Sequence, residues 1–132
     1  MCIFCKIINH EIPSAVVYED QDVLAILDIS QVTKGHTLVM PKKHVRNILE
    51  ADDETAEACI RTAKMLAKRI VERTGAAGVN VLTNCGEAAG QTVEHLHFHI
   101  IPRYSSNDAI TIEFNPSEKQ DLEAVCALLK ED

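Results

Sequence analysis

The sequence lacks the features that mark several classes of protein. Among its 132 residues, no apolar run approaches the roughly 18 residues that a membrane span needs. It also lacks a positive charge balance, because the formal net charge is −7. Non-specific binding to a nucleic-acid backbone requires a basic surface, so we expect no nucleic-acid partner. A small phosphate ligand is not excluded, since a site can be locally positive on an acidic protein.

Cysteine usage also argues against a secreted scaffold. The chain has five cysteines, an odd number, and it is long enough to bury a core without disulfides. Its first residues, "MCIFCKIINHEIPS", lack the charged start and long apolar stretch of a signal peptide. Internal repeats, low-complexity segments and linkers are absent too. We therefore expect one domain, residues 1–132, in a cytoplasmic, reducing compartment, with no membrane association.

Alternating and helical patterns predict the secondary structure. Strands are expected at residues 15–20, 23–28, 36–41, 78–85 and 95–102. The segment 52–73 has no Gly or Pro, shows helical apolar spacing and is followed by Gly75, a common helix stop. A second helix is expected over 116–130, with Asn115 as its cap and Glu118 three residues later. Strands outnumber helices and mostly adjoin one another in sequence, which favours an antiparallel sheet of the α+β class.

A row of histidines stands out within the last expected strand. The stretch "HLHFHII" places three of the six histidines at alternate positions. In a strand, such residues share a face at intervals of roughly 6.6 Å. His95, His97 and His99 would therefore lie on one side, and the intervening apolar residues would face the core. A half-solvated strand does not need three histidines, whereas an imidazole can act as nucleophile, acid, base or metal ligand near neutral pH.

Two kinds of chemistry fit this row. One ion cannot bind all three rings, because the outer two are roughly 13 Å apart along a strand, but two rings and a further ligand could hold a metal. Alternatively, a neutral imidazole attacks phosphorus while a neighbouring ring positions the phosphoryl oxygens or protonates the leaving group. Full protonation of adjacent rings is disfavoured, so one can stay neutral while another holds a proton.

The loop that precedes the row favours a phosphate ligand. In "NCGEAAGQT", Gly86 and Gly90 allow backbone N–H groups to approach an anion closely. Asn84, Gln91 and Thr92 add neutral hydrogen-bonding side chains.

These stretches together resemble the histidine triad (HIT) family. The similarity rests on "HLHFHII", on "GQTVEHLHFHIIPR" around it and on "LDISQVTKGHTLVMPKKH" earlier in the chain. It extends over residues 2–104 and is loose over the tail, 105–132. The resemblance implies a five-stranded antiparallel sheet with one long central helix and a C-terminal helix, dimerising into a continuous sheet. It also implies a nucleotide hydrolase or transferase that acts at the α-phosphate of a purine nucleotide of the AMP type.

The same resemblance assigns roles to individual residues. His97 would be the nucleophile that forms a covalent nucleotidyl-histidine, His99 would contact phosphate and assist proton transfer, and His36 would support the site. Asp28 would hold the ribose hydroxyls, and Ile29 would pack against the base. The phosphate or leaving group would be contacted by the loop residues Asn84, Gly90, Gln91 and Thr92. This scheme requires no catalytic metal.

A second candidate site begins at "CIFC". A Cys-x-x-Cys pair alone is more often two small buried cysteines, but members of the Hint-like branch combine it with two histidines that match His44 and His95 here. The resemblance thus implies a structural zinc site with the ligands Cys2, Cys5, His44 and His95. We expect His10 at the surface, and three cysteines remain unpaired without a role: Cys59, Cys85 and Cys126. Glu94 also has no assigned role.

Four functional hypotheses remain at this point. The leading one is hydrolysis of adenylyl phosphoramidates or related substrates, which the Cys-x-x-Cys pair and "LDIS" favour. The second is a dinucleoside polyphosphate hydrolase of the fragile-histidine-triad type, because "EAAGQTV" resembles that branch as well and carries its glutamine at Gln91. The others are a zinc hydrolase that uses two histidines of the row, and a nucleotide-binding or scaffold module with little catalysis.

Overall fold

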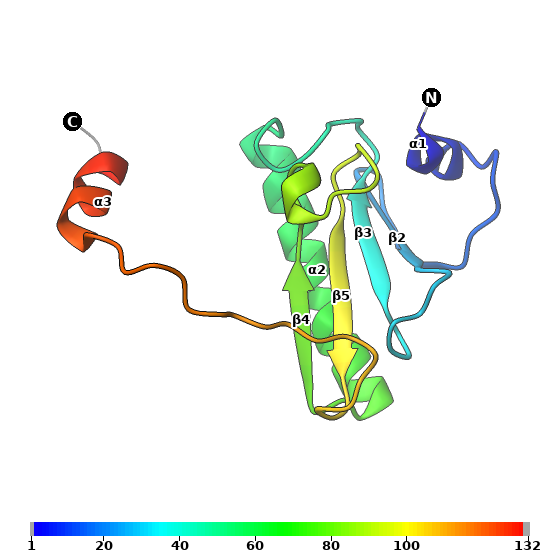
Figure 1. Ribbon diagram of the computed structural model, residues 1–132. Coiled ribbons are helices and arrows are strands. Elements are labelled where there is room, and N and C mark those ends of the chain that lie inside the picture. The colour runs from blue at the N-terminus through cyan, green and yellow to red at the C-terminus, as the bar shows by residue number, and fades with distance from the viewer. Residues whose placement is uncertain (1, 131–132) are drawn as a thin grey trace.

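The computed structural model describes residues 2–130, and its centre is a five-stranded antiparallel sheet (Figure 1). The strand order is β1-β2-β3-β5-β4. The last two strands pair in antiparallel fashion, and a loop of 15 residues in irregular and 3-10 conformation connects them. The strands are β1 (Val16–Glu19), β2 (Val23–Leu27), β3 (Thr37–Pro41), β4 (Gly78–Leu82) and β5 (Phe98–Arg103). The predicted antiparallel α+β fold is confirmed.

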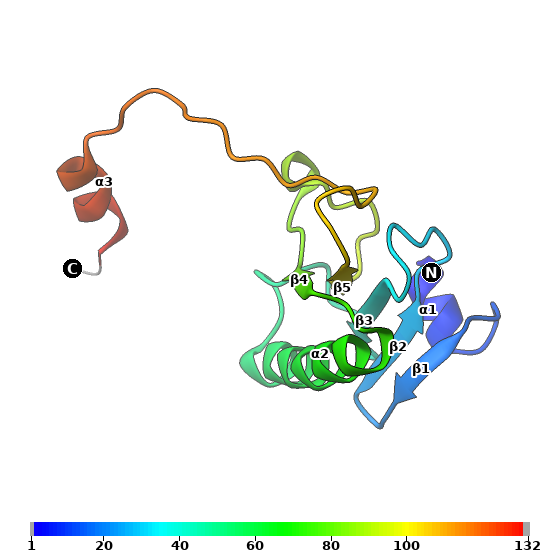
Figure 2. The ribbon, with the colours of Figure 1, turned by 90° about the horizontal axis from the view of Figure 1, so that it is seen from below.

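The long helix α2 (Asp53–Thr74) covers one face of the sheet (Figure 2). It begins where the Asp52 side chain accepts a hydrogen bond from the Thr55 N–H, and it ends at Gly75 in the left-handed conformation. Its apolar side packs on alternate strand residues to form the larger core: Val23, Ala25, Val39, Cys59, Ala63, Leu66, Ala67, Leu96, Phe98 and Ile100. Each fully buried Val, Leu, Ile or Phe side chain of this core stabilises the fold by about 2 kcal/mol.

The short helix α1 (Ile3–Ile8) lies on the opposite face of the sheet. Its Phe4 and Ile7 pack on the strand residues that point away from α2, which are Leu24, Ile26, Leu38 and Met40. The sequence did not predict this helix, because six residues are too few to show a helical apolar period. The sheet is therefore buried on both faces, but only one face has a long helix.

The histidine segment departs from the prediction at its start. Strand β5 begins at Phe98, so His95 and His97 precede it, whereas we expected a regular strand from residue 95. The cause is a different backbone partner: the Leu96 N–H bonds to the Val45 carbonyl, which lies outside the sheet. The predicted alternation is nevertheless confirmed, since Leu96, Phe98 and Ile100 all belong to the core under α2.

The C-terminal part of the chain extends away from the sheet as a long segment that ends in α3 (Leu122–Leu129) (Figure 1). This helix begins at Asp121, whose side chain caps the Ala124 N–H, so the prediction that it begins at Pro116 with Asn115 as its cap was wrong. Residues 111–124 are exposed, which leaves the expected first turns without a packing partner. Within residues 2–130, no helix is sufficiently long and apolar to cross a membrane.

Candidate functional site

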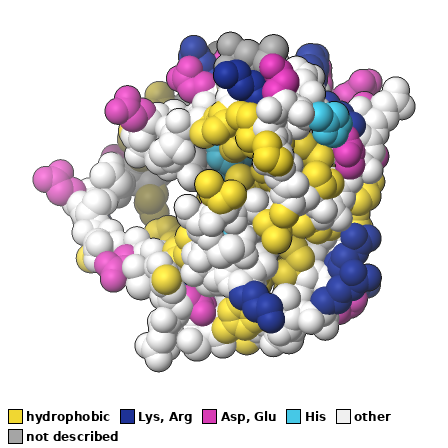
Figure 3. All heavy atoms as spheres, turned by 90° about the vertical axis from the view of Figure 1, so that its right-hand side faces the viewer, with side chains coloured by type: hydrophobic (Ala, Val, Ile, Leu, Met, Phe, Trp, Pro, Cys, Tyr) yellow, Lys and Arg dark blue, Asp and Glu magenta, His cyan; other side chains and the backbone are white. Residues whose placement is uncertain are grey.

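The histidines of the row lie on the α1 side of the sheet. His99 is opposite Leu38 in the β3–β5 pairing, and Leu38 belongs to the core under α1. Figure 3 shows this side of the molecule, where histidine is visible in a recess among hydrophobic side chains and charged side chains gather toward the rim. A recess of this composition desolvates an imidazole while leaving one edge of it within reach of a ligand.

His97 is held in a single protonation pattern. Its Nδ1 lies 2.7 Å from the carbonyl oxygen of His95. A carbonyl can only accept, so Nδ1 carries the proton and Nε2 keeps its lone pair. The ring contacts the rings of Phe4 and His99, with centroid distances of 5.0 and 5.1 Å. Burial lowers the pKa of His97, which keeps the ring neutral and nucleophilic near neutral pH.

His99 receives its orientation from His36, which lies just before β3. The Val32 N–H points at His36 Nδ1 at 3.4 Å, so the proton of this ring is on Nε2, which lies 2.9 Å from His99 Nδ1. His99 thus accepts at Nδ1 and presents an N–H at Nε2. Burial, reinforced by the neighbouring His97 and His36, lowers the pKa of His99 to about 4. The Oδ2 atom of Asp28 lies 3.7 Å from His36 Nε2.

The loop of residues 28–36 holds Asp28 and His36 close together. The Gln31 amide nitrogen donates to the carbonyl oxygens of Asp28 and His36, at 2.6 and 2.7 Å. The Gln31 amide oxygen accepts from the Gly35 N–H, and the Asp28 N–H bonds to the His36 carbonyl. The loop is therefore closed at its base, while Ile29, directly after Asp28, is completely exposed.

The loop of residues 83–92 begins beside the nucleophile candidate. Thr83 Oγ1 donates to the His97 carbonyl at 2.7 Å. Farther along, the Gln91 amide accepts from the Gly86 N–H and donates to the carbonyl oxygens of Arg46 and Val93. Gly90 has φ +94° and a half-buried Asn84 beside it, while Thr92 is exposed. The Gln91 side chain therefore stabilises the loop itself.

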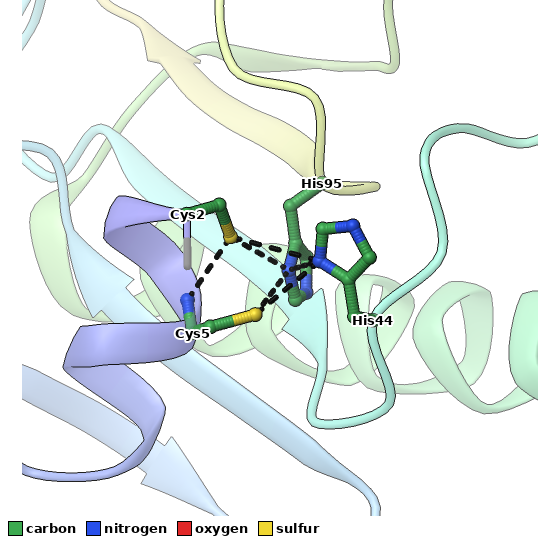
Figure 4. A group of neighbouring side chains, drawn as sticks. All are labelled: Cys2, Cys5, His44 and His95. Carbon is green, nitrogen blue, oxygen red and sulfur yellow. Dashed lines mark hydrogen bonds between the residues drawn. The ribbon is translucent and has the colours of Figure 1, made fainter.

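Four side chains at the other end of the row converge on one point (Figure 4). One donor atom from each of Cys2, Cys5, His44 and His95 lies within 4.8 Å of the others. Sulfur-to-Nδ1 distances are 3.3–3.6 Å, and the two Nδ1 atoms are 3.1 Å apart. A tetrahedral zinc ion with the usual bond lengths requires edges of about 3.5 Å between S and N and about 3.3 Å between N and N. The four S–N edges and the N–N edge therefore already come close to those of a zinc tetrahedron.

Protonation also fits a cation at this point. His95 is fully buried, and its Nε2 donates to the Pro41 carbonyl at 2.8 Å, which leaves the lone pair of Nδ1 facing the cysteines. A backbone acceptor behind the ring is the usual arrangement for a metal-binding histidine. Without an ion, burial and the adjacent Cys2 raise the pKa of Cys5, so paired thiolates here require a positive partner.

The structure thus gathers the predicted residues into two groups and leaves several apart. Asp28, His36 and His99 are close neighbours, as are the four Cys and His residues above. At the surface, Glu94 Oε2 lies 3.9 Å from Arg46 Nε. No disulfide joins the cysteines, all of which lie within the described residues. Cys59 is on the buried side of α2, where burial raises the pKa of its thiol to about 12, while Cys85 is half-buried and Cys126 is exposed.

Three residues that contact the site were missed in the sequence. Phe4 contacts the rings of His95 and His97, Thr83 fixes the His97 backbone, and Gln31 closes the 28–36 loop. Phe4 had one available signal, since it is the aromatic residue inside Cys-x-x-Cys. Thr83 and Gln31 act by bonding to backbone atoms of other residues. Such bonds follow no fixed residue spacing, so the sequence alone does not reveal them.

A comparison with known sequences identifies a family and close relatives. A family model described as "HIT domain" matches residues 9–106. "Protein hit" from Bacillus subtilis is 56% identical over 107 residues, which cover 81% of this chain and 74% of that protein. "Adenosine 5'-monophosphoramidase HNT1" from Saccharomyces cerevisiae is 38% identical over 130 residues, which cover 98% of this chain and 79% of that protein.

Solved structures agree with these matches. A HIT family protein from Bacillus anthracis has a TM-score of 0.91 and 44% identity, with 97% of this chain and 94% of the other covered. A zinc-bound histidine triad family protein from Mycobacterium smegmatis has a TM-score of 0.77 and 34% identity, with coverages of 97% and 94%. Both likenesses extend over nearly the whole of each chain.

Proposed function

The chain belongs to the HIT domain family, and on this premise we propose that it hydrolyses adenylyl phosphoramidates or related purine nucleotides at the α-phosphate. The reaction would pass through a covalent nucleotidyl-His97. The observation that carries the proposal is the protonation pattern of His97: Nδ1–H is committed to the His95 carbonyl, and Nε2 retains its lone pair. A relative that is named as an adenosine 5'-monophosphoramidase supports the choice of substrate.

In the first step, His97 Nε2 attacks the α-phosphorus. A P–N bond forms, the bond to the leaving group breaks, and the leaving group departs with the electron pair and receives a proton. The positive charge that develops on the imidazole is stabilised at Nδ1–H by the His95 carbonyl. This covalent route divides one displacement into two easier ones. In the second step, water attacks the same phosphorus and loses a proton to solvent, which balances the proton that solvent supplied to the leaving group. His97 leaves with the electron pair of the P–N bond, which restores the neutral ring.

His99 would contact the phosphoryl oxygens and assist proton transfer. Because His36 occupies its Nδ1, the N–H of His99 is on Nε2 and is available to an oxygen anion. The lowered pKa of His99 keeps this ring neutral too, so no positive charge lies beside His97 in the resting site. His36 therefore acts through His99, by fixing which nitrogen carries the proton.

The remaining substrate contacts are proposed from the resemblance and from position. The Asp28 carboxylate would bind the ribose hydroxyls, and the exposed Ile29 would pack on the base. One oxygen of Asp28 already accepts from the Ser30 N–H, which fixes the orientation of the carboxylate. Asn84, Gly90, Gln91 and Thr92 would surround the phosphate or leaving group. The hydrogen bonds of the Gln91 side chain to the Gly86 N–H and the Arg46 carbonyl favour an indirect role, in which Gln91 positions the backbone of the loop.

The second part of the proposal is a structural zinc ion bound by Cys2, Cys5, His44 and His95. Support comes from the tetrahedral donor distances, from the Nδ1 lone pair of His95 and from the zinc-bound neighbour. When bound, zinc would crosslink α1, the segment after β3 and the start of the histidine row. All four ligand positions would be filled by protein, so the ion would take no part in the chemical step.

We also propose a cytoplasmic homodimer. Strand β4 is at the edge of the sheet, and Val81 on it is an exposed apolar residue. An edge strand of this kind is suited to pairing with a second copy into a continuous sheet. Sedimentation of the purified chain tests this part: a single species with the mass of the monomer would contradict it.

The decisive experiment for the activity is release of AMP from adenosine 5'-phosphoramidate by wild type and by His97→Ala. We expect turnover by the wild type and loss of turnover in the variant, while equal rates would overturn the proposal. Diadenosine tetraphosphate in the same assay tests the dinucleoside polyphosphate alternative, which predicts faster cleavage of that substrate. Tight AMP binding without turnover of either compound would instead favour a binding module.

A further inference from the structure

Phe4 connects the two groups of side chains that the proposed function treats separately. It lies between Cys2 and Cys5 in α1 and is buried. Its ring makes an edge contact with His95 at 5.9 Å and with His97 at 5.0 Å, with interplanar angles of 76° and 85°. One side chain therefore contacts both a candidate metal ligand and the candidate nucleophile.

The contacts of His97 show what Phe4 contributes. The Nδ1–H bond to the His95 carbonyl fixes one atom of the ring but still allows the plane to tilt about that bond. Phe4 and His99 limit this tilt, because both of their rings contact the imidazole at similar centroid distances. The tilt determines where the Nε2 lone pair points, so it sets the line of attack on phosphorus.

The position of Phe4 depends on the attachment of α1. This helix of six residues is too short to be stable alone. It is held by the apolar contacts of Phe4 and Ile7 with the sheet, and by the convergence of Cys2 and Cys5 on His44 and His95. Loss of the Cys and His cluster would therefore release one of the two attachments of the helix that carries Phe4.

We propose that Phe4 is a positioning residue through which the Cys2, Cys5, His44 and His95 cluster sets the orientation of the His97 ring. The inference rests on the proposed function for its catalytic consequence, because it assumes that His97 Nε2 is the attacking atom. Its structural content is independent of substrate: the orientation of His97 changes when Phe4 or the cluster is altered.

The experiment compares ring-deleting variants with a control on the same helix. Phe4→Leu and Phe4→Met keep an apolar side chain but remove the aromatic edge, and the second variant serves if the first does not fold. Ile8→Ala is the control, because Ile8 is a partly buried member of the same core. Each zinc-loaded protein is examined by metal analysis, by steady-state kinetics with adenosine 5'-phosphoramidate, and by histidine ring ¹H–¹⁵N spectra without substrate.

We expect the Phe4 variants to retain the metal and to bind substrate with KM within about twofold of wild type, while kcat falls by about tenfold. Their spectra should show His97 shifted or broadened, with the Ile8→Ala spectrum unchanged at this residue. Zinc-free Cys5→Ser should show the same change at His97. A raised KM with normal kcat would overturn the inference by making Phe4 a substrate contact, and an unaltered His97 spectrum in the Phe4 variants would also contradict it.

The two proposals can fail separately. If the wild type does not hydrolyse the phosphoramidate, the proposed function fails, while the ring spectra still decide whether Phe4 orients His97. If the wild type is active and the His97 signals do not respond to Phe4 or Cys5, the activity stands and the inference fails.

Discussion

The two ends of the histidine row differ in function although they are built from the same residue type. At one end, His95 donates Nε2–H to the Pro41 carbonyl and turns the lone pair of Nδ1 toward two cysteines and His44. Two residues later, His97 donates Nδ1–H to the His95 carbonyl and keeps the lone pair of Nε2. Burial lowers the pKa of both rings, so charge does not distinguish them.

The difference is decided by backbone carbonyls. Each ring is neutral, and the backbone carbonyl that accepts its N–H determines which ring nitrogen keeps a lone pair. The same segment therefore holds a ligand-like imidazole facing sulfur and a nucleophile-like imidazole in contact with the rings of Phe4 and His99. The comparison predicts that substitutions at the two ends will separate stability and metal content from catalysis.

The largest expected effect is on turnover, at the His97 end. His97→Ala should reduce kcat by on the order of 10⁴-fold, because it removes the imidazole that would form the bond to phosphorus. Zinc content and thermal stability should stay near those of the wild type. Rapid mixing with adenosine 5'-phosphoramidate, metal analysis and thermal unfolding measure these three quantities. Loss of zinc in this variant would show that the two ends are not separable.

The next effect is on stability, at the cysteine end. Cys5→Ser removes one of four tetrahedral donors and should lower the free energy of unfolding by on the order of 3 kcal/mol, together with loss of bound zinc. Urea unfolding followed by circular dichroism gives the first quantity. Cys126→Ser is the matched control, since Cys126 is exposed on α3. Equal stability of both variants, with zinc retained, would contradict the metal site.

A smaller effect is expected from the residue that orients His99. His36→Ala removes the donor to His99 Nδ1 at 2.9 Å and should reduce kcat by about 10- to 100-fold without loss of zinc. His10→Ala is the control, because His10 is exposed and its backbone N–H bonds to the Ile7 carbonyl at the end of α1. A wild-type kcat in His36→Ala would mean that His99 does not need a fixed proton position.

The pH profile should show the smallest change over the physiological range. Catalysis needs neutral rings, and a lowered pKa means that protonation occurs only at lower pH than for an ordinary histidine of pKa 6.5. With a His99 pKa of about 4, kcat/KM should therefore stay nearly level from pH 8 to pH 6 and decline as the pH falls further. A midpoint at or above pH 6.5 would show that the site does not depress these pKa values.

The sequence predicted the parts of this comparison that depend on spacing. The alternation of His95, His97 and His99 with buried residues followed from the two-residue period of extended chain. The helix α2 followed from 22 residues without Gly or Pro. Both patterns depend only on neighbouring residues and repeat several times. The predicted alternation is therefore correct even though β5 begins at Phe98 rather than at His95.

The protonation pattern of the row could not be predicted in the same way. It depends on Pro41, which is 54 residues before His95, and on a bend that puts the His95 carbonyl beside the His97 ring. The contact of Phe4 with both rings requires α1, whose six residues give no periodic signal. The start of α3 was also missed, because Asn115 and Asp121 are both acceptable caps and only packing distinguishes them.

The central claim is that His97 Nε2 becomes bonded to phosphorus. Its most direct test is mass spectrometry of protein quenched in alkaline denaturant within milliseconds of mixing with adenosine 5'-phosphoramidate. The account predicts a mass increase of one adenylyl group that maps to the peptide containing His97, is absent in His97→Ala and disappears as AMP accumulates. Steady release of AMP with no such adduct, or an adduct on another residue, would contradict it.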